Sequence, residues 1–533
     1  MDSATLLDTN APKSTASSNG NTVAVLMAFV AALGPLVFGY TLGFSSPSSL
    51  PMMVAPPGTW TFQAVFSNPS VDWNSDHTSG SVSSAENSLF GSIVNVGAMI
   101  GALIAAPLAD SAGRKLAIAT SAVPFIAAWL LIGLTDVFAA ILVGRLLSGI
   151  AVGIASMCVP LYISETAPAS LRGGLGAVNQ FAVTGGILLV YLLGFLLEEK
   201  RPTIYSCQND QGEDTCPFGV CADPAKDTCD TILSPWRVLA IVGACISGAL
   251  LVCALLILPE TPNHLVAKGK TTAARKVLSR LRSSEAEAEE EYEALLRKQA
   301  STTQVSDTAE EMGNFAAAAS EPKVGGMRGL FSKGVRKQFF VGCMLMVFQQ
   351  FSGINAVIFF SSSILQSGGI DDPNEGGLIV MAVQVLMTGV AVLLMDRAGR
   401  RMLLLISLTG MTLFTGTLAA FYYNDNKPAW LSLTSLVGYI VFFSLGLGAI
   451  PWLIMGEIFP GHVRALAASI ATLLNWTLSF IVTETFASLL SALGPSVTFT
   501  IFGGVCALGI CFVVAFVPET KGKTFEEIEA LFR

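Results

Sequence analysis

Twelve stretches of predominantly apolar residues follow one another along the chain, separated by more polar segments. They cover roughly residues 23–44, 88–109, 116–135, 139–162, 174–197, 236–258, 338–365, 377–395, 402–423, 431–456, 464–490 and 497–517. An apolar stretch of about 20 residues crosses a bilayer as one helix, because lipid cannot satisfy exposed backbone polar groups. The pattern therefore predicts an all-α membrane protein with twelve transmembrane helices.

Composition supports a membrane protein and argues against other classes of protein. Only 13% of the 533 residues are charged, against about 25% in soluble domains. The net charge is -8 and there is no basic arm, so a nucleic-acid partner has no electrostatic attraction to the chain. The three histidines lie far apart in sequence, which argues against a histidine metal site. We expect a lipid environment, no metal and no cofactor.

The distribution of Lys and Arg predicts the orientation. The connections 45–87, 366–376 and 491–496 contain neither residue, and the segment 259–337 contains 13. Basic residues collect in cytosolic connections. The alternate short connections hold Arg114, Lys115, Arg172, Arg397, Arg400, Arg401 and Arg464. Both termini are therefore expected in the cytosol.

Three motifs occur twice, in the same order. Asp110–Lys115 recurs as Asp396–Arg401, the Glu165, Pro168 and Arg172 set recurs as Glu457, Pro460 and Arg464, and Pro259–Thr261 recurs as Pro518–Thr520. Duplication of this kind indicates two pseudo-symmetric six-helix bundles in parallel orientation. The predicted organisation is a tail 1–22, a bundle 23–258, a cytosolic segment 259–337, a bundle 338–517 and a tail 518–533.

The segment 259–337 has its own pattern. Residues 271–282 and 285–298 read as short amphipathic helices, and the Ser/Ala/Gly-rich residues 301–326 read as a flexible linker. A wholly disordered segment is the alternative.

Opposite charges meet in each repeated motif. These charges would form ion pairs when the cytosolic helix ends come together. Such ion pairs would stabilise one conformation of a two-state carrier over the other. Solvated charge is the alternative, since an exposed pair contributes only about 0–1 kcal/mol. The residues concerned are Asp110, Arg114, Glu165, Arg172, Asp396, Arg400, Glu457 and Arg464.

These motifs, together with Arg145–Gly149, Pro160–Gly173, Pro259–Pro262, Gln349–Asn355 and Pro518–Phe525, resemble the sugar porter family of the major facilitator superfamily over about residues 23–530. The resemblance implies alternating access, in which two halves rock about a central sugar site. It extends to the facilitative hexose transporters. Where the family usually has tyrosines after the Asn of the seventh span, this chain has Phe359 and Phe360, which the resemblance places in the gate.

A sugar offers neutral hydroxyl groups and an apolar ring face, so its site needs amides and an aromatic side chain without fixed charge. Polar side chains inside apolar spans face a bundle interior. Bonds between helices are the alternative role, at about 0.6 kcal/mol each. The candidates, which match the sugar-contact positions of the family, are Gln180, Gln349, Gln350, Asn355, Gln384, Trp452, Asn475 and Trp476.

The mechanism is expected to be facilitated diffusion (uniport) of a hexose such as glucose. Sugar–proton symporters resembling the chain carry an aspartate after Gly-Tyr in the first span, and Thr41 stands there. Arg145 thus lacks its titrating partner, and Glu484 is the acid that could still support coupling. A proton-coupled sugar or polyol symporter is the first alternative, and a non-transporting sugar sensor is the second. No catalytic set suggests an enzyme.

Two features concern the location. Cys207, Cys216, Cys221 and Cys229 lie in one connection on the expected oxidising side, where two disulfides can form in three pairings. Asp2–Leu7 forms an acidic dileucine pattern, in which Leu6 and Leu7 would contact sorting adaptors. The plasma membrane and an endolysosomal or vacuolar membrane both remain open.

Overall fold

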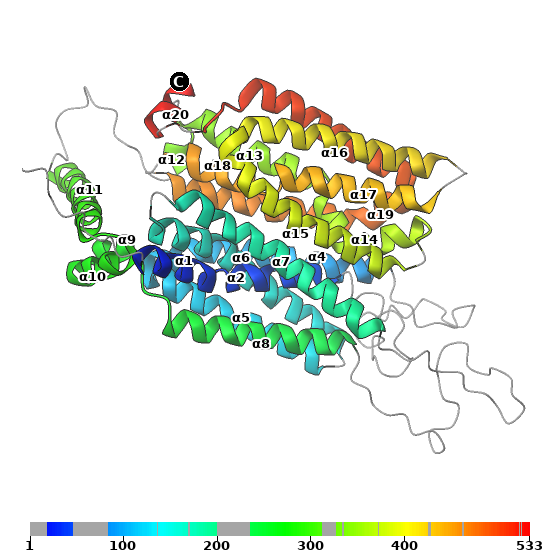
Figure 1. The fold of residues 1–533 in the computed structure, drawn as a ribbon, viewed down its shortest axis with the longest axis horizontal. Coiled ribbons are helices and arrows are strands. Elements are labelled where there is room, and N and C mark those ends of the chain that lie inside the picture. The colour runs from blue at the N-terminus through cyan, green and yellow to red at the C-terminus, as the bar shows by residue number, and fades with distance from the viewer. Residues whose placement is uncertain are drawn as a thin grey trace, which may run out of the picture.

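A computed structural model describes residues 19–45, 84–135, 137–168, 171–199, 235–311, 327–332, 335–370, 372–424, 428–460, 463–521, 523 and 525–532. Every regular element in these ranges is a helix, and the long helices run side by side in one elongated bundle (Figure 1). The four cysteines of residues 200–234 and the Leu6–Leu7 signal lie outside the described residues, as do the side chains of Arg172 and Asp396.

The N-terminal half contains the first six spans. The first span is divided at Ala32 into two helices, and each of the next five is one continuous helix. The helices are α1 (Asn19–Ala31), α2 (Leu33–Gly43), α4 (Ser84–Ala112), α5 (Arg114–Leu134), α6 (Phe138–Thr166), α7 (Arg172–Glu199) and α8 (Pro235–Leu256).

The C-terminal half contains the other six spans. Its helices are α13 (Arg336–Phe351), α14 (Ile354–Ser367), α15 (Pro373–Ala398), α16 (Arg400–Tyr423), α17 (Ala429–Leu445), α18 (Ile450–Ile458) and α19 (Arg464–Phe516). Among the described residues, 11 helical segments are long and apolar enough to cross a membrane. The last of them, α19, holds two crossings, because the backbone leaves the helical region at Gly494, just before Pro495. The all-α prediction of twelve spans is confirmed.

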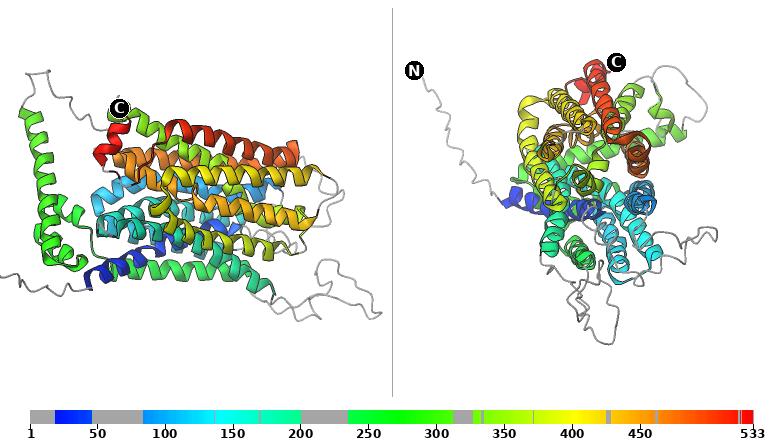
Figure 2. Two further views of the ribbon diagram at one scale, coloured as in Figure 1. Left: turned by 45° about the horizontal axis from the view of Figure 1, so that its top comes forward. Right: turned by 90° about the vertical axis from the view of Figure 1, so that its right-hand side faces the viewer.

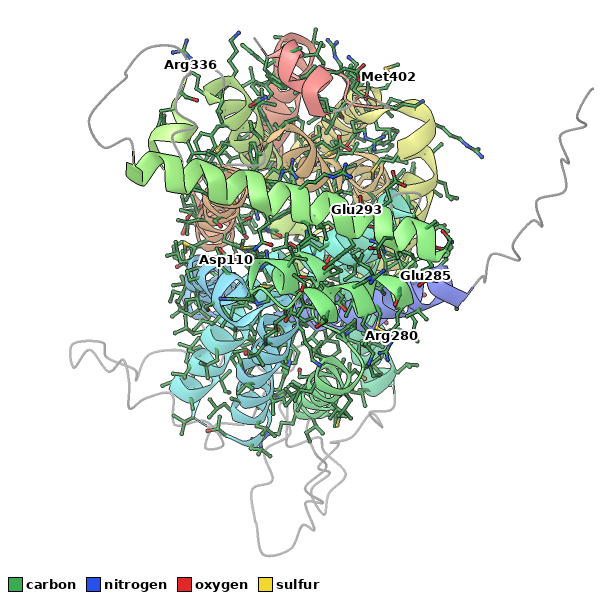
Figure 3. The ribbon with its side chains drawn as sticks, turned by 90° about the vertical axis from the view of Figure 1, so that its left-hand side faces the viewer. Asp110, Arg280, Glu285, Glu293, Arg336 and Met402 are labelled. Atoms are coloured by element: carbon green, nitrogen blue, oxygen red, sulfur yellow. The ribbon has the colours of Figure 1, made fainter. Side chains whose placement is uncertain are left out.

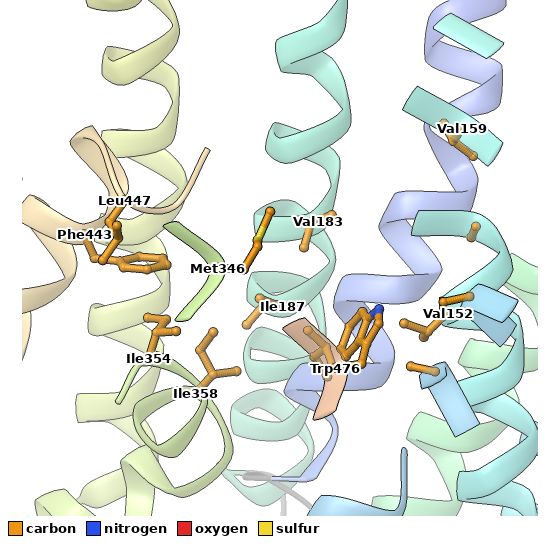
Figure 4. Packing of buried hydrophobic residues seen from close by; sticks show 14 of the residues in the cluster. Val152, Val159, Val183, Ile187, Met346, Ile354, Ile358, Phe443, Leu447 and Trp476 are labelled. Carbon is orange, nitrogen blue, oxygen red and sulfur yellow. The ribbon is translucent and has the colours of Figure 1, made fainter. Parts of the chain in front are cut away.

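The two halves lie side by side along the length of the bundle (Figure 2). They meet mainly through two helix pairs, α4 against α19 and α7 against α15. Between them, Met346, Ile354 and Ile358 of the seventh span face Val183 and Ile187 of α7 (Figure 4). Most of this interface is therefore apolar, and the polar side chains within it stand out.

One end of the bundle carries Arg114, Arg400 and the helices of the segments outside the spans, and we call it the motif end. These helices are α9 (Pro262–Ala267), α10 (Thr271–Leu281), α11 (Glu285–Glu311), α12 (Met327–Leu330) and α20 (Phe525–Leu531). Leu265, Val266 and Ala274 form a small apolar core under α11. Figure 3, which looks onto this end, shows α11 crossing it from Glu285 past Glu293.

The two predicted helices of the central segment are present, but the second is longer than expected. It continues to Glu311, so residues 301–311 are helical and do not belong to the predicted linker. The physical reason lies in the sequence, since residues 301–311 contain neither Gly nor Pro.

Candidate substrate site

The seventh span is interrupted at the position where its amides cluster. α13 ends at Phe351 and α14 begins at Ile354, because Gly353 adopts a left-handed conformation (φ 92°). A Cβ at Gly353 would also lie 2.5 Å from the ring of Phe502. The break leaves Gln350 and Asn355 close together, five residues apart, and brings both side chains to one face.

Five polar side chains join in a single hydrogen-bonded chain, which we call the amide cluster. It consists of Gln350, Asn355, Asn475, Ser479 and Asn95, all buried. Gln350 Nε2 donates to Asn475 Oδ1 at 2.7 Å, and Asn355 Nδ2 donates to Gln350 Oε1 at 2.6 Å and to Ser479 Oγ at 2.6 Å. Ser479 Oγ donates to Asn95 Oδ1 at 2.9 Å. The cluster crosses from the C-terminal half to α4 of the N-terminal half.

Gln349 points elsewhere. Its Nε2 donates to the carbonyl oxygens of Leu447 at 2.8 Å and Gly448 at 3.1 Å, which are left free where α17 stops and α18 has not yet begun. The tenth span is thus interrupted at residues 446–449, just before Trp452. Gln349 holds this break, whereas Gln350 and Asn355 form the cluster.

The remaining predicted amides and tryptophans make none of the hydrogen bonds described above for the amide cluster. Gln384 of α15 and Trp476 of α19 are buried, and Gln180 of α7 and Trp452 of α18 are half-buried. The Trp476 ring packs edge-on against Phe38 of α2, with ring centroids 5.6 Å apart. Among the described residues, Gln384 Oε1 and Trp476 Nε1 are buried without a hydrogen-bond partner.

Aromatic and polar contacts close the interface toward the end opposite the motifs. The Phe360 ring faces Gly91 of α4 across the interface. Within the C-terminal half this ring stacks on Phe486 with centroids 5.4 Å apart, and Phe359 is buried beside it. Tyr191 Oη donates to the Ile358 carbonyl at 2.8 Å, joining α7 to α14 across the two halves. This end is held shut by direct contacts between the halves.

Glu484 takes part in this closure. Ser92 Oγ of α4 donates to Glu484 Oε2 of α19 at 2.5 Å, a bond between the halves. Ser92 lies close to the start of α4, whose other end adjoins Arg114, so this contact is near the end opposite the motifs.

Arg145 is fully buried among neutral partners. Its guanidinium donates to the carbonyl oxygens of Phe90 and Thr41 and to Ser45 Oγ, and it lies over the Phe90 ring at 4.8 Å. The Thr41 hydroxyl donates to the Val37 carbonyl at 2.8 Å. Backbone dipoles and aromatic faces thus surround the cation.

The repeated motifs form the same structure twice at the motif end. Arg114 Nη2 contacts Glu165 Oε1 at 3.1 Å, and Arg400 Nη2 contacts Glu457 Oε1 at 3.2 Å. Asp110 reaches Arg114 at 3.6 Å. Each of these pairs joins helices of one half. Arg464 Nε donates to the Phe459 carbonyl at 3.0 Å.

A second carboxylate caps a helix in each copy. Glu260 accepts from the Arg114 backbone N–H at 2.9 Å at the start of α5, and Glu519 accepts from the Arg400 backbone N–H at 2.9 Å at the start of α16. Negative charge is stabilised at a helix N-terminus. Gly113 and Gly399 have positive φ, and a Cβ at either would collide with the capping carboxylate. The glycine of each motif is required for this reason.

The motif-end network shifts two pKa values. Burial raises the pKa of the Glu519 carboxyl, but hydrogen bonds from the backbone N–H groups of Lys521, Arg400, Arg401 and Thr520 outweigh burial and leave it below its ordinary value. Burial lowers the pKa of His264, which the charge of Glu260 opposes and that of Arg114 reinforces. His264 Nδ1 lies 3.2 Å from Arg114 Nη1 and accepts its hydrogen bond when neutral.

The site offers amide and hydroxyl groups and aromatic faces. Such groups bind a neutral polyhydroxylated molecule well and offer nothing to attack a bond. In the described part of the chain, no three His, Cys, Asp or Glu residues gather as metal ligands. Sequence reasoning missed Asn95, Ser479 and Ser92. Asn95 had the signal used for the others, an amide inside an apolar span, whereas serines are too common in spans to stand out.

Comparisons with known proteins agree with this architecture. Residues 27–532 match the family model described as "Sugar (and other) transporter". The chain is 38% identical to Sugar transporter ERD6-like 6 of Arabidopsis thaliana, over 95% of this chain and 89% of the relative. It is 35% identical to Facilitated trehalose transporter Tret1 of Aedes aegypti over 95% of this chain, and it spans 54% of that longer protein.

The fold also matches a solved transporter. The structure of the proton:xylose symporter XylE bound to 6-bromo-6-deoxy-D-glucose has a TM-score of 0.70 at 24% identity, covering 96% of this chain and 100% of XylE. The chain therefore belongs to the sugar transporter family.

Proposed function

We propose that the chain carries a hexose such as glucose across a membrane by facilitated diffusion. The observation that carries the proposal is the buried, uncharged amide cluster that spans the two halves. Its donors and acceptors suit the neighbouring hydroxyl groups of a sugar. Separation of the halves at one end and then at the other would expose these groups to each compartment in turn.

The orientation follows from charge. The basic residues of the short connections collect at the motif end, which we place in the cytosol together with both termini. On this orientation the end closed by Phe360, Tyr191 and Glu484 faces away from the cytosol. The described conformation is therefore shut toward the outer or lumenal side.

Uniport is favoured by the surroundings of Arg145. A proton-coupled carrier needs a buried group whose charge changes during the cycle. The partners of Arg145 given above are neutral, and Thr41 cannot titrate at physiological pH. One contact favours the alternative of proton symport, namely that between Ser92 and the Glu484 carboxylate, which lies at the interface that must open.

The test is counterflow in proteoliposomes. Vesicles loaded with unlabelled D-glucose are diluted into trace labelled D-glucose, and parallel vesicles use trehalose and D-xylose, the sugars named for the relatives. We expect transient accumulation of label with D-glucose. The absence of counterflow with every sugar would reject transport and favour a sensor. Accumulation driven by a pH gradient alone, abolished in Glu484→Gln, would replace uniport by symport.

The membrane of residence is a separate proposal. Leu6 and Leu7 would bind sorting adaptors and direct the protein to an endolysosomal or vacuolar membrane. Replacement of both by alanine is expected to shift a fluorescent fusion to the plasma membrane. An unchanged distribution would remove the signal.

A further inference from the structure

Asn95 is the one member of the amide cluster that belongs to the N-terminal half. Only one of its two side-chain polar groups is hydrogen-bonded. Its side chain is fully buried, and its Oδ1 accepts from Ser479 Oγ at 2.9 Å. Its Nδ2 has no hydrogen-bond partner among the described residues. Exchanging the amide oxygen and nitrogen would not remove the deficit, because one of the two groups would still be left unpaired.

An unpaired buried amide is costly. Leaving such a donor without an acceptor destabilises the folded protein, and a leucine of similar size would avoid this cost. Buried polar groups without partners are rare, and each calls for a specific explanation. The need to join two helices explains the Oδ1 of Asn95 but not its Nδ2.

The surroundings of Asn95 indicate what the free donor meets. Through Ser479 it continues the chain of donors and acceptors that runs from Asn475 and Gln350 through Asn355. Gly91, one turn earlier on α4, faces the ring of Phe360, so the aromatic closure lies directly beyond Asn95. Asn95 thus lies between the rest of the amide cluster and the Phe360 ring, and it faces the amides of the other half.

We propose that Asn95 is a substrate-binding residue, whose Nδ2 donates a hydrogen bond to one hydroxyl group of the bound sugar. The inference rests on the proposed function and deepens it, since it assigns α4 a direct contact with substrate. A sugar held by Asn95 on one side and by Gln350 and Asn355 on the other bridges the halves. The bound sugar therefore joins the two halves in addition to the Ser479–Asn95 hydrogen bond.

The experiment pairs variants with deoxy sugars. Equilibrium binding of D-glucose and its 2-, 3-, 4- and 6-deoxy analogues is measured by tryptophan fluorescence of full-length protein in detergent. Asn95→Leu removes both amide groups. Asn95→Ser keeps a hydroxyl for Ser479 but loses the Nδ2 donor, and it serves if the leucine variant does not fold. Ser121→Ala is the control, because Ser121 is a buried serine of α5 in the same half whose hydroxyl donates to the Ile118 carbonyl of its own helix.

If Asn95 contacts the sugar, one analogue binds the wild type about 10-fold more weakly than D-glucose, as expected for a lost hydrogen bond of about 1.4 kcal/mol. Both Asn95 variants then bind D-glucose about 10-fold more weakly and no longer distinguish that analogue from it. Ser121→Ala keeps the wild-type discrimination. Wild-type discrimination retained in both Asn95 variants would overturn the inference, whatever their overall affinity. A wild type that binds none of these sugars would instead overturn the proposed function, and this inference with it.

Discussion

Asn355 is the residue on which the amide cluster depends most. Its Nδ2 supplies both Gln350 Oε1 and Ser479 Oγ, so Asn355→Ala leaves two buried acceptors without a donor. We expect saturable sugar uptake to fall at least 10-fold, since each lost bond in a buried site costs about 1–3 kcal/mol. Uptake into proteoliposomes of matched protein content measures it.

The control for this prediction lies on the same helix. Gln366→Ala removes an exposed amide from α14, and uptake should stay at the wild-type rate. Normal uptake by Asn355→Ala would remove Asn355 from the site.

His264 gives the motif end a pH dependence of defined sign. Its pKa lies below the ordinary value in the folded protein, so the unfolded chain takes up a proton first as the pH falls. The stabilising contribution of neutral His264 is therefore complete above about pH 6.5 and declines below it, until the pH passes the folded pKa. The hydrogen bond at stake, from Arg114, is worth about 1 kcal/mol.

Thermal unfolding in detergent at pH 7.5 and pH 5.5 tests this dependence. The difference between the two midpoints should be smaller in His264→Gln, which does not titrate and keeps an acceptor for Arg114. Equal differences in the two proteins would show that other groups cause the pH dependence.

The break in the seventh span depends on Gly353. A residue with a Cβ there would be strained at φ 92° and would collide with Phe502. Gly353→Ala should therefore lower the free energy of unfolding by about 1–3 kcal/mol and displace Asn355 from Gln350. The readouts are the unfolding midpoint and uptake, and both should fall.

Gly504→Ala is the matched substitution, because a Cβ at Gly504 of α19 would meet nothing within 4 Å. Alanine is a better helix former than glycine by about 0.5–1 kcal/mol. Its unfolding midpoint should stay the same or rise. A fall of equal size in both variants would mean that alanine is harmful in spans generally and that the break is not the cause.

The helices α10 and α11 are tied to the N-terminal half through Arg282. Its buried guanidinium donates to Glu291 Oε1 of α11 at 2.8 Å and to the Thr166 carbonyl at the end of α6 at 2.9 Å. Arg282→Gln should release this connection and speed cleavage of α11 by a glutamate-specific protease about 10-fold, as a loss of about 1.4 kcal/mol would. Arg275→Gln removes an exposed pair with Glu289 and should change little. Equal cleavage rates would contradict the prediction.

The same elements show what the sequence can predict. The spans follow from length and apolarity, because lipid permits only helices for such segments. The break at Gly353 is signalled by a glycine among polar residues, but the division at Ala32 carries no such signal. The end of α11 lies beyond the predicted residue 298, since the Ser/Ala-rich composition of residues 301–311 suits a helix as well as a linker.

The residues of the candidate site likewise include some that the sequence predicts and some that it does not. Gln350, Asn355 and Asn475 could be predicted because amides are costly in an apolar span unless they have a role there. Asn95 satisfies that criterion too, but it is not among the residues that the family resemblance indicates. The bond between Ser92 and Glu484 joins positions 392 residues apart, and only the packing of α4 against α19 reveals it.

For the whole molecule, the duplicated networks raise the question of how the two halves communicate. The pair Arg114–Glu165 belongs to the N-terminal half, and Arg400–Glu457 belongs to the C-terminal half. A pair within one half stiffens that half whether the motif end is open or closed. In this conformation the bonds described between the halves are instead polar contacts of uncharged side chains, together with Glu484.

Additivity distinguishes stiffening of each half from locking of the two halves together. If the networks are independent, Arg114→Gln and Arg400→Gln each lower the free energy of unfolding by about 1–2 kcal/mol, and the double variant loses the sum to within about 0.5 kcal/mol. Arg114→Gln combined with Glu165→Gln is the internal control, because both act on one network and their effects should not add. If the networks instead locked the halves together, the second arginine substitution would meet an interface already broken and would cost much less than the first. Chemical unfolding of these variants and of Glu165→Gln alone, five in all, in one detergent measures all of these terms. A subadditive arginine pair would show that the networks lock the two halves together and are not independent.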